Sequence, residues 1–178
     1  MIWGPTKPKK LRLAAFPKIW RAAFRQIDDA NVLINASTLE HLDLYQRLHI
    51  EKTGWSWMHT LPNLKSFSMI QFVIESLTGI EENSSIDTLC VAYPRKLTSL
   101  NGIEAFKSLK RLEIEGARQL EDMSGIGKLE NLKQLQIIGS TRPKSWDFLY
   151  SLPNLEWVFF NGDEVWQHGK LTKKFSTS

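Results

Sequence analysis

The stretch from Leu97 to Ile114 changes its apolar spacing part-way, and this change limits the fold more than any other feature of the sequence. Apolar residues occur at every third position as far as Leu112, and the next one, Ile114, follows after two. An amphipathic α-helix keeps a mean period near 3.6 and does not tighten to two without a turn signal. A single helix therefore does not explain the pattern.

The same pattern recurs along the chain at a nearly fixed distance. A shift of 23 residues places an apolar residue under each of its seven positions, and a second shift of 23 does so with Pro143 as the exception. The element apolar-x-x-apolar-x-apolar begins at Leu39, Leu64, Ile86, Leu109, Leu132 and Leu155. The steps between these positions are 25, 22, 23, 23 and 23 residues, so the chain repeats one structural unit.

This pattern resembles the leucine-rich repeat family, in the variety whose leucines also recur at every third position of the return segment. The resemblance extends from Leu39 to about Asp163. It implies an α/β solenoid with short parallel strands on a concave face and 3₁₀ or short helical returns on the convex side. A strand repeats every two residues and a 3₁₀ segment every three, which accounts for the change in spacing.

Stacked coils bury their leucines only against their neighbours, so the ends of a solenoid need covers. We expect a basic N-terminal cap over residues 1–38, six repeats over residues 39–163 and a C-terminal cap or tail over residues 164–178. The family usually carries Asn or Cys after the strand to bond the turn, and this chain does not. Gly116, Gly139 and Gly162 precede that position instead, and we expect them to take positive φ in a differently built turn.

The first segment carries most of the positive charge. Residues 1–38 have a net charge of +5, residues 39–163 of −3 and residues 164–178 of +2, which gives the +4 of the whole chain. Apolar residues between Pro17 and Ile27 fall on one side of a helix, which predicts an N-terminal capping helix, with a short strand near residues 32–34. The alternative is a basic amphipathic helix that binds nucleic acid or an acidic membrane surface.

Candidate catalytic groups do not form a recognised motif. Cys90 and four histidines are not placed in a known signature, and Glu113 and Glu115 form an acidic patch as readily as a catalytic pair. We expect no enzyme activity, no cofactor and no metal. No apolar run has the length of a membrane span, the first residues lack a secretory signal, and one cysteine excludes an intramolecular disulfide. We therefore expect a cytoplasmic protein.

The candidate binding surface consists of the outward-pointing strand residues. If the strand leucines point inward, the third, fifth and seventh positions of each motif point outward. Trp, Tyr and Arg often carry the binding energy of protein interfaces, and two acidic residues lie in the middle of the array. The candidate protein-binding residues are Tyr45, Arg111, Glu113, Glu115, Gln134, Gln136, Trp157 and Phe159. The C-terminal tail covers Trp157 and Phe159 in one arrangement and leaves them exposed in the other.

These observations favour a non-enzymatic module that binds another protein on its concave face. The preferred subtype within the resemblance is a stoichiometric inhibitor of a toxin or enzyme, of the bacterial immunity or antitoxin type. A scaffold or adaptor protein is one alternative, and a nucleic-acid or membrane-surface binder that uses its basic ends is another. We expect a protein partner, no nucleic acid and no membrane.

Overall fold

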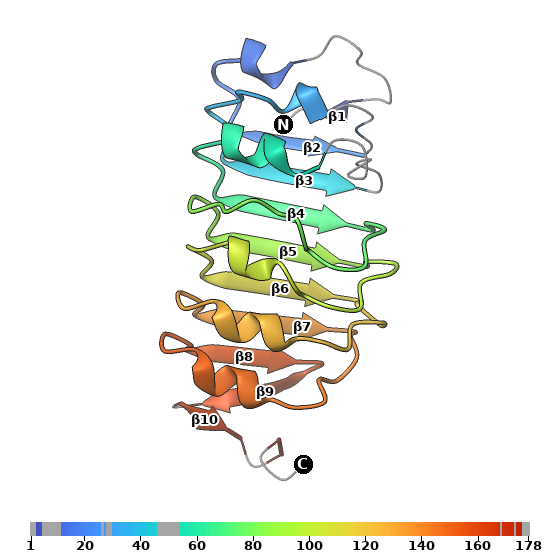
Figure 1. Ribbon diagram of the computed structural model, residues 1–178, viewed down its shortest axis with the longest axis vertical. Coiled ribbons are helices and arrows are strands. Elements are labelled where there is room, and N and C mark those ends of the chain that lie inside the picture. Colours follow the sequence, from blue (N-terminus) through green and yellow to red (C-terminus); the bar gives the residue numbers. More distant parts are fainter. Residues whose placement is uncertain are drawn as a thin grey trace.

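The computed structural model describes residues 3–4, 12–25, 27, 30–45, 54–167, 169–172 and 174–175. Within these residues, ten strands form one sheet in which each strand pairs with the next in chain order, from β1 to β10. Figure 1 shows the strands stacked one above another, with the returns crossing back in front of them. The architecture is a solenoid of stacked coils.

The first eight strands pair in parallel. They are β1 (Trp3–Gly4), β2 (Arg21–Phe24), β3 (His41–Tyr45), β4 (Ser66–Ile70), β5 (Thr88–Ala92), β6 (Arg111–Glu115), β7 (Gln134–Ile138) and β8 (Trp157–Phe160). Leu112 of β6 lies opposite Leu135 of β7, which lies opposite Val158 of β8. The strand positions and register predicted from the 23-residue spacing are confirmed.

The returns contain 3₁₀ turns, as the three-residue spacing predicts. They are η1 (Leu13–Ala15), η2 (Ala30–Val32), η3 (Ser56–Thr60), η4 (Ile103–Ala105), η5 (Ser124–Lys128) and η6 (Asp147–Ser151). The described residues contain no α-helix, so the helical part of the expected α/β class is absent from them. The return between β4 and β5 is extended, and its Asn83 forms a parallel bridge with Phe106 of the next coil.

The core lies between the sheet and the returns. All seven apolar residues of the pattern from Leu97 to Ile114 are at most 1 % exposed. Complete burial of a large aliphatic or aromatic side chain contributes about 1.5–3 kcal/mol, and most of these side chains pack against the coils above and below. The regular spacing therefore specifies one continuous core along the stack.

The expected N-terminal capping helix is wrong. Residues Arg21–Phe24 form β2, which pairs in parallel with β3, and the strand expected near residues 32–34 is instead the end of η2 and the turn after it. The carbonyl oxygen of Trp20 accepts hydrogen bonds from two backbone N–H groups of the next coil, as its counterparts farther along do. This segment is another coil of the same solenoid.

The physical reason is that the three-residue spacing continues into this segment with smaller side chains. Ile27, Ala30, Leu33, Ala36 and Leu39 are all buried at intervals of three residues. By contrast, Trp20, which the helical interpretation placed in the apolar stripe, is 55 % exposed. Alanines occupy repeat positions at which the other coils have larger apolar residues. A search for regularly spaced leucines therefore does not detect this coil.

Beyond β8 the chain reverses direction. β9 (Asp163–Gln167) pairs antiparallel with β8, and β10 (Lys170–Leu171) pairs antiparallel with β9. Val165 and Trp166 are buried, so this hairpin covers the end of the core. It lies beside β8 and does not cross the outer face of the sheet, so Trp157 and Phe159 stay partly exposed.

Some expectations concern residues outside the described ones. The residues concerned are Lys7, Lys9 and Lys10 of the basic N-terminal segment, the histidines His49 and His168, and Lys173 of the C-terminal segment. The segment boundaries at residues 38 and 163 stay predictions. Among the described residues, no helix has the length and apolar character needed to cross a membrane.

Candidate protein-binding face

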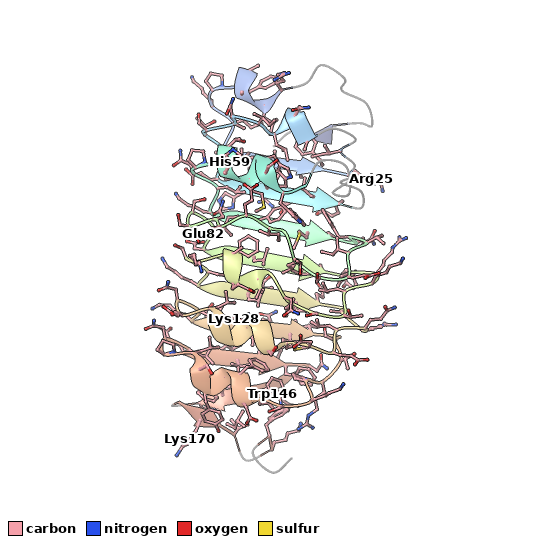
Figure 2. The ribbon with its side chains drawn as sticks, in the orientation of Figure 1. Arg25, His59, Glu82, Lys128, Trp146 and Lys170 are labelled. Atoms are coloured by element: carbon pink, nitrogen blue, oxygen red, sulfur yellow. The ribbon has the colours of Figure 1, made fainter. Side chains whose placement is uncertain are left out.

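The side chains expected to bind a partner lie on the side of the sheet that points away from the core. We call this side the open face, and the returns with the labelled His59 and Lys128 lie on the opposite side (Figure 2). On most strands from β3 to β8, buried residues alternate with partly exposed ones. The open face consists of Arg21, Ala23, His41, Asp43, Tyr45, Ser66, Ser68, Ile70, Thr88, Cys90, Ala92, Arg111, Glu113, Glu115, Gln134, Gln136, Ile138, Trp157, Phe159 and Glu164.

Two ladders of hydrogen bonds hold the coils that carry the open face. Where each strand from β3 to β8 begins, one carbonyl oxygen of the preceding coil accepts hydrogen bonds from two backbone N–H groups. The carbonyl oxygen of Lys110, for example, accepts from Lys133 and Gln134. The second ladder consists of side-chain amides: Asn63, Asn131 and Asn154 donate to carbonyl oxygens of the preceding coil at 2.7–2.9 Å. These asparagines precede the strand, whereas the family pattern places them after it.

Glycines shape the turns at which the strands end. Gly116, Gly139 and Gly162 have φ values of 63°, 60° and 100°, which confirms the expected left-handed turns. The N–H of Gly116 donates to the carbonyl oxygen of Ile138 at 2.8 Å, and that of Gly139 donates to the side-chain oxygen of Asn161 at 2.6 Å. These bonds take the place of the asparagine ladder that the family usually has here.

Tyr93 also lies at the edge where the strands end, and the sequence interpretation missed it. Its ring lies over Gly116, where a Cβ atom would come within 2.5 Å of the ring. The Tyr93 hydroxyl donates a hydrogen bond to the Glu115 carboxylate, and this bond raises the pKa of Tyr93. Tyr93 is 50 % exposed. The available signal was a tyrosine at the repeat position that holds glycine in the next coils.

The structure joins Arg111, Glu113 and Gln134 in one hydrogen-bonded chain on β6 and β7. Arg111 Nε donates to Glu113 Oε1 at 2.7 Å, and another guanidinium nitrogen donates to Gln134 Oε1 at 2.9 Å. Exposed ion pairs of this kind contribute about 0–1 kcal/mol to stability, so the core does not depend on them. Glu113 is thus already paired, whereas Glu115 bonds a neutral hydroxyl and keeps its negative charge uncompensated there.

The aromatic residues of β8 form a stacked pair next to this hydrogen-bonded group of side chains. The ring centroids of Trp157 and Phe159 are 5.6 Å apart with an interplanar angle of 12°. Phe159 lies opposite Gln136 of β7 and opposite Glu164 of β9. Seven of the predicted residues therefore lie on three adjacent strands, β6 to β8.

Tyr45 is not part of this group. It is the last residue of β3, and three strand spacings, about 14 Å, separate β3 from β6. Its neighbours on β2 to β5 are mostly small or internally paired: Arg21 donates to Asp43 at 3.0 Å, and Ser66 and Ser68 follow on β4. Trp20, directly before β2, is another large ring in this region and lies edge-on to His41 with ring centroids 5.4 Å apart.

Cys90 lies on β5 between the two halves of the open face. Burial raises the pKa of its thiol to about 11, and the negative charges of Glu113, Glu115 and Asp43 act in the same direction. Reactive cysteines have lowered pKa values, because the thiolate is the nucleophile. The Cys90 thiol is therefore protonated at neutral pH.

Two hollows lie on the return side of the coils. One of about 370 Å³ is lined mainly by residues of η2 and η3, among them Trp57 and His59. One of about 410 Å³ is lined by the segments that lead into η5 and η6 and by the first residues of these turns. His59 pairs with Glu81 at 3.3 Å, and Asp122 accepts hydrogen bonds from Ser124 that lower its pKa. No group of His, Cys, Asp and Glu in the described part of the chain could hold a metal ion.

Comparison with known proteins concerns the fold alone. No protein-family model matches the sequence, and no curated protein matches it. Among solved structures, the chain is similar to an internalin from Listeria monocytogenes, with 17 % sequence identity and a TM-score of 0.44. The match covers 84 % of this chain and 49 % of the internalin chain, so this chain spans about half of the internalin's length. The parallel strands and 3₁₀ returns are those of a leucine-rich-repeat-like solenoid.

Proposed function

We propose that the chain is a non-enzymatic protein-binding module that uses the part of its open face from β6 to β9. The observation that carries this proposal is the composition of that part: Arg111, Glu113, Glu115, Trp157 and Phe159 are all partly exposed. None of them fills the core, which Leu112, Ile114, Val158 and Phe160 occupy on the other side of the same strands. Aromatic residues and arginine are enriched at protein interfaces and supply most of their binding energy.

The size and rigidity of the open face fit this proposal. The strands from β2 to β9 span about 34 Å at the usual strand spacing, enough for a standard interface of about 800 Å² per partner. The two ladders hold the outward side chains on fixed strands, so binding orders few additional groups. A surface that is ordered before binding loses less entropy on association.

The finer proposal is stoichiometric inhibition of a partner enzyme or toxin in the cytoplasm, as immunity and antitoxin proteins do. An inhibitor of this kind acts by covering a site and needs no chemistry of its own. The acidic excess on β6 to β9 suits a basic active or substrate-binding site, because complementary charge gives specificity and fast association. A toxin gene beside the gene for this chain supports the inhibitor, whereas a partner whose activity is unchanged by binding supports a scaffold.

Site-specific photo-crosslinking tests where a partner binds. A benzophenone amino acid replaces Gln136 on the open face, and in a matched variant it replaces Lys128 of η5 on the return side. In extracts of the source cells, we expect a discrete adduct with one protein from position 136 and none with that protein from position 128. Adducts with the same protein from both positions, or from position 128 alone, contradict binding through the open face.

A further inference from the structure

We infer that Trp157, Phe159 and Glu164 form a subsite that binds an arginine side chain of a partner protein. This inference rests on the proposed function and deepens it by naming the chemistry of the partner. It depends on three observations: the stacked rings, the carboxylate beside them and the charge of the surrounding open face.

The rings and the carboxylate lie on the same side of the sheet. Phe159 and Glu164 are partners in the antiparallel pair of β8 and β9, on the C-terminal side of a register shift between Val158 and Phe159. Directly opposite residues of such a pair point to the same face, with Cβ atoms about 4.5–5.5 Å apart. Trp157, two residues before Phe159, stacks on it. A planar cation placed over the rings therefore lies within reach of the Glu164 carboxylate.

The protein itself does not supply that cation in the described residues. The cations that lie over aromatic rings there are Arg142 and Lys174, and both lie over Phe175. Arg111, the nearest arginine along the open face, is held by Glu113 and Gln134. The Glu164 carboxylate accepts a hydrogen bond from Gln167, and a carboxylate can accept several.

The charge of the open face selects a basic partner. Between β6 and β9 the charged side chains of this face are Arg111, Glu113, Glu115 and Glu164, a net charge of −2. Between β2 and β5 they are Arg21 and Asp43, which cancel. An apolar side chain seated on the rings would take the negative charge of Glu164 out of water without a cation to pair with it, which is unfavourable.

Arginine suits this subsite better than lysine. The guanidinium group is planar, stacks on aromatic faces and offers several N–H donors to a carboxylate at the same time. It is also more weakly hydrated than an ammonium group, so covering it on a sheet surface costs less. Cation–π contacts are most favourable with tryptophan, which supplies one ring of this pair.

The register suggests the spacing of a second arginine. Glu113 of β6 and Phe159 of β8 are joined through Gln136, two strand spacings or about 10 Å apart. Residues three apart in a peptide with polyproline II conformation lie on the same side of the peptide, and about 9 Å separates them. A peptide of the form Arg-x-x-Arg can therefore place one guanidinium on the rings and the other near the acidic residues of β6.

Nuclear magnetic resonance titration with short peptides tests the subsite directly. The probe is acetyl-Gly-Arg-Gly-Gly-Arg-Gly-amide, with one version that carries lysine and one that carries citrulline, the neutral analogue of arginine, at both positions. We expect saturable shifts of the Trp157 indole N–H and of the Phe159 and Glu164 amides with the arginine peptide. The lysine peptide should bind about fivefold more weakly, and the citrulline peptide should give no saturable shift.

Two conservative variants separate the aromatic and acidic contributions. Trp157→Leu keeps an apolar side chain without the ring, and Glu164→Gln removes the charge from an exposed residue. Each should weaken binding of the arginine peptide about fivefold or more. Trp20→Leu, at an exposed ring on the other end of the solenoid, and Glu156→Gln, outside the open face, should stay within twofold of the parent chain. The backbone spectrum verifies that each variant is folded.

Equal responses to arginine and citrulline, or unchanged binding in both Trp157→Leu and Glu164→Gln, overturn the inference. In that case the proposed function is still supported by a crosslink at position 136. If instead the arginine peptide binds but no crosslink forms at position 136, the subsite is supported and the proposed partner interface is contradicted. Concentration-dependent shifts of the same residues without peptide assign the subsite to a second copy of the chain and also overturn the inference.

Discussion

The two halves of the open face have the same backbone and different side chains. From β2 to β5 the face carries mostly small or internally paired residues, such as Ser66, Ser68 and the Arg21–Asp43 pair. From β6 to β9 it carries uncompensated carboxylates and a stacked aromatic pair. The inward residues are apolar in both halves. The repeat therefore fixes the scaffold, and the outward positions are free to differ from coil to coil.

The scaffold is equivalent in both halves if matching core positions contribute equally. Leu42 of β3 and Leu135 of β7 occupy the same column and are both 0 % exposed. We expect Leu42→Ala and Leu135→Ala each to lower the free energy of unfolding by about 2–5 kcal/mol, because each opens a cavity between coils. Urea unfolding followed by circular dichroism measures both. A loss below about 1 kcal/mol in Leu42→Ala alone would show that the N-terminal coils are not part of the common core.

The asparagine ladder offers a smaller test of the same equivalence. Asn63 and Asn154 occur in the same local sequence, Leu-Pro-Asn-Leu, in different halves, and each side chain donates to a carbonyl oxygen of the preceding coil. Asn63→Ala and Asn154→Ala should each cost about 0.5–1.5 kcal/mol, the usual net contribution of such a hydrogen bond. Thermal unfolding compares them, with Asn101→Ala as the control outside this column. If Asn101→Ala lowers the stability as much as the two ladder variants do, the hydrogen bonds of the ladder do not account for the loss.

Cys90 reports on the boundary between the two halves. Its pKa in the folded protein is about 11, above the ordinary 9.0, so the folded state keeps its proton where the unfolded chain loses it. This contribution to stability is fully present below pH 9 and is lost as the pH rises from about 9 to about 11. The parent chain should therefore lose more stability than Cys90→Ala over this range, as followed by urea unfolding at each pH. Equal losses would mean that the acidic half and burial do not act on Cys90.

How much of the fold the sequence predicts depends on the residues that fill the columns. The register of the strands from β6 to β8 was predicted correctly, because leucine and isoleucine mark the repeated positions there, whereas the predicted strand ends differ by one or two residues. The pattern shifted by 70 residues also falls on seven apolar residues between Ile27 and Leu44, but Ala30 and Ala36 are weak markers of a core. A helix and a solenoid coil both bury alanine, and only pairing with neighbouring strands separates the two.

The candidate site was predicted in its position and only partly in its contacts. Alternation along the strands placed Arg111, Glu113 and Trp157 on one face, because a strand presents every second residue to the same side. The pairing of Glu115 with Tyr93 depends on a ring that folds across a glycine in the next coil. The position of Glu164 depends on a reversal of chain direction after β8. Repeat spacing does not encode either contact.

The central claim is that the half of the open face from β6 to β9 binds the partner, and affinity measured on matched double variants tests it most directly. Isothermal titration with the crosslinked partner compares Glu113→Ala/Glu115→Ala on β6 with Ser66→Ala/Ser68→Ala on β4. Removing one side of buried charge pairs typically costs 2–5 kcal/mol, so the β6 variant should bind about 30-fold more weakly or worse. The β4 variant should stay within about twofold. A folded β6 variant that binds as well as the parent chain, or a β4 variant that loses more affinity than the β6 variant, would contradict the claim.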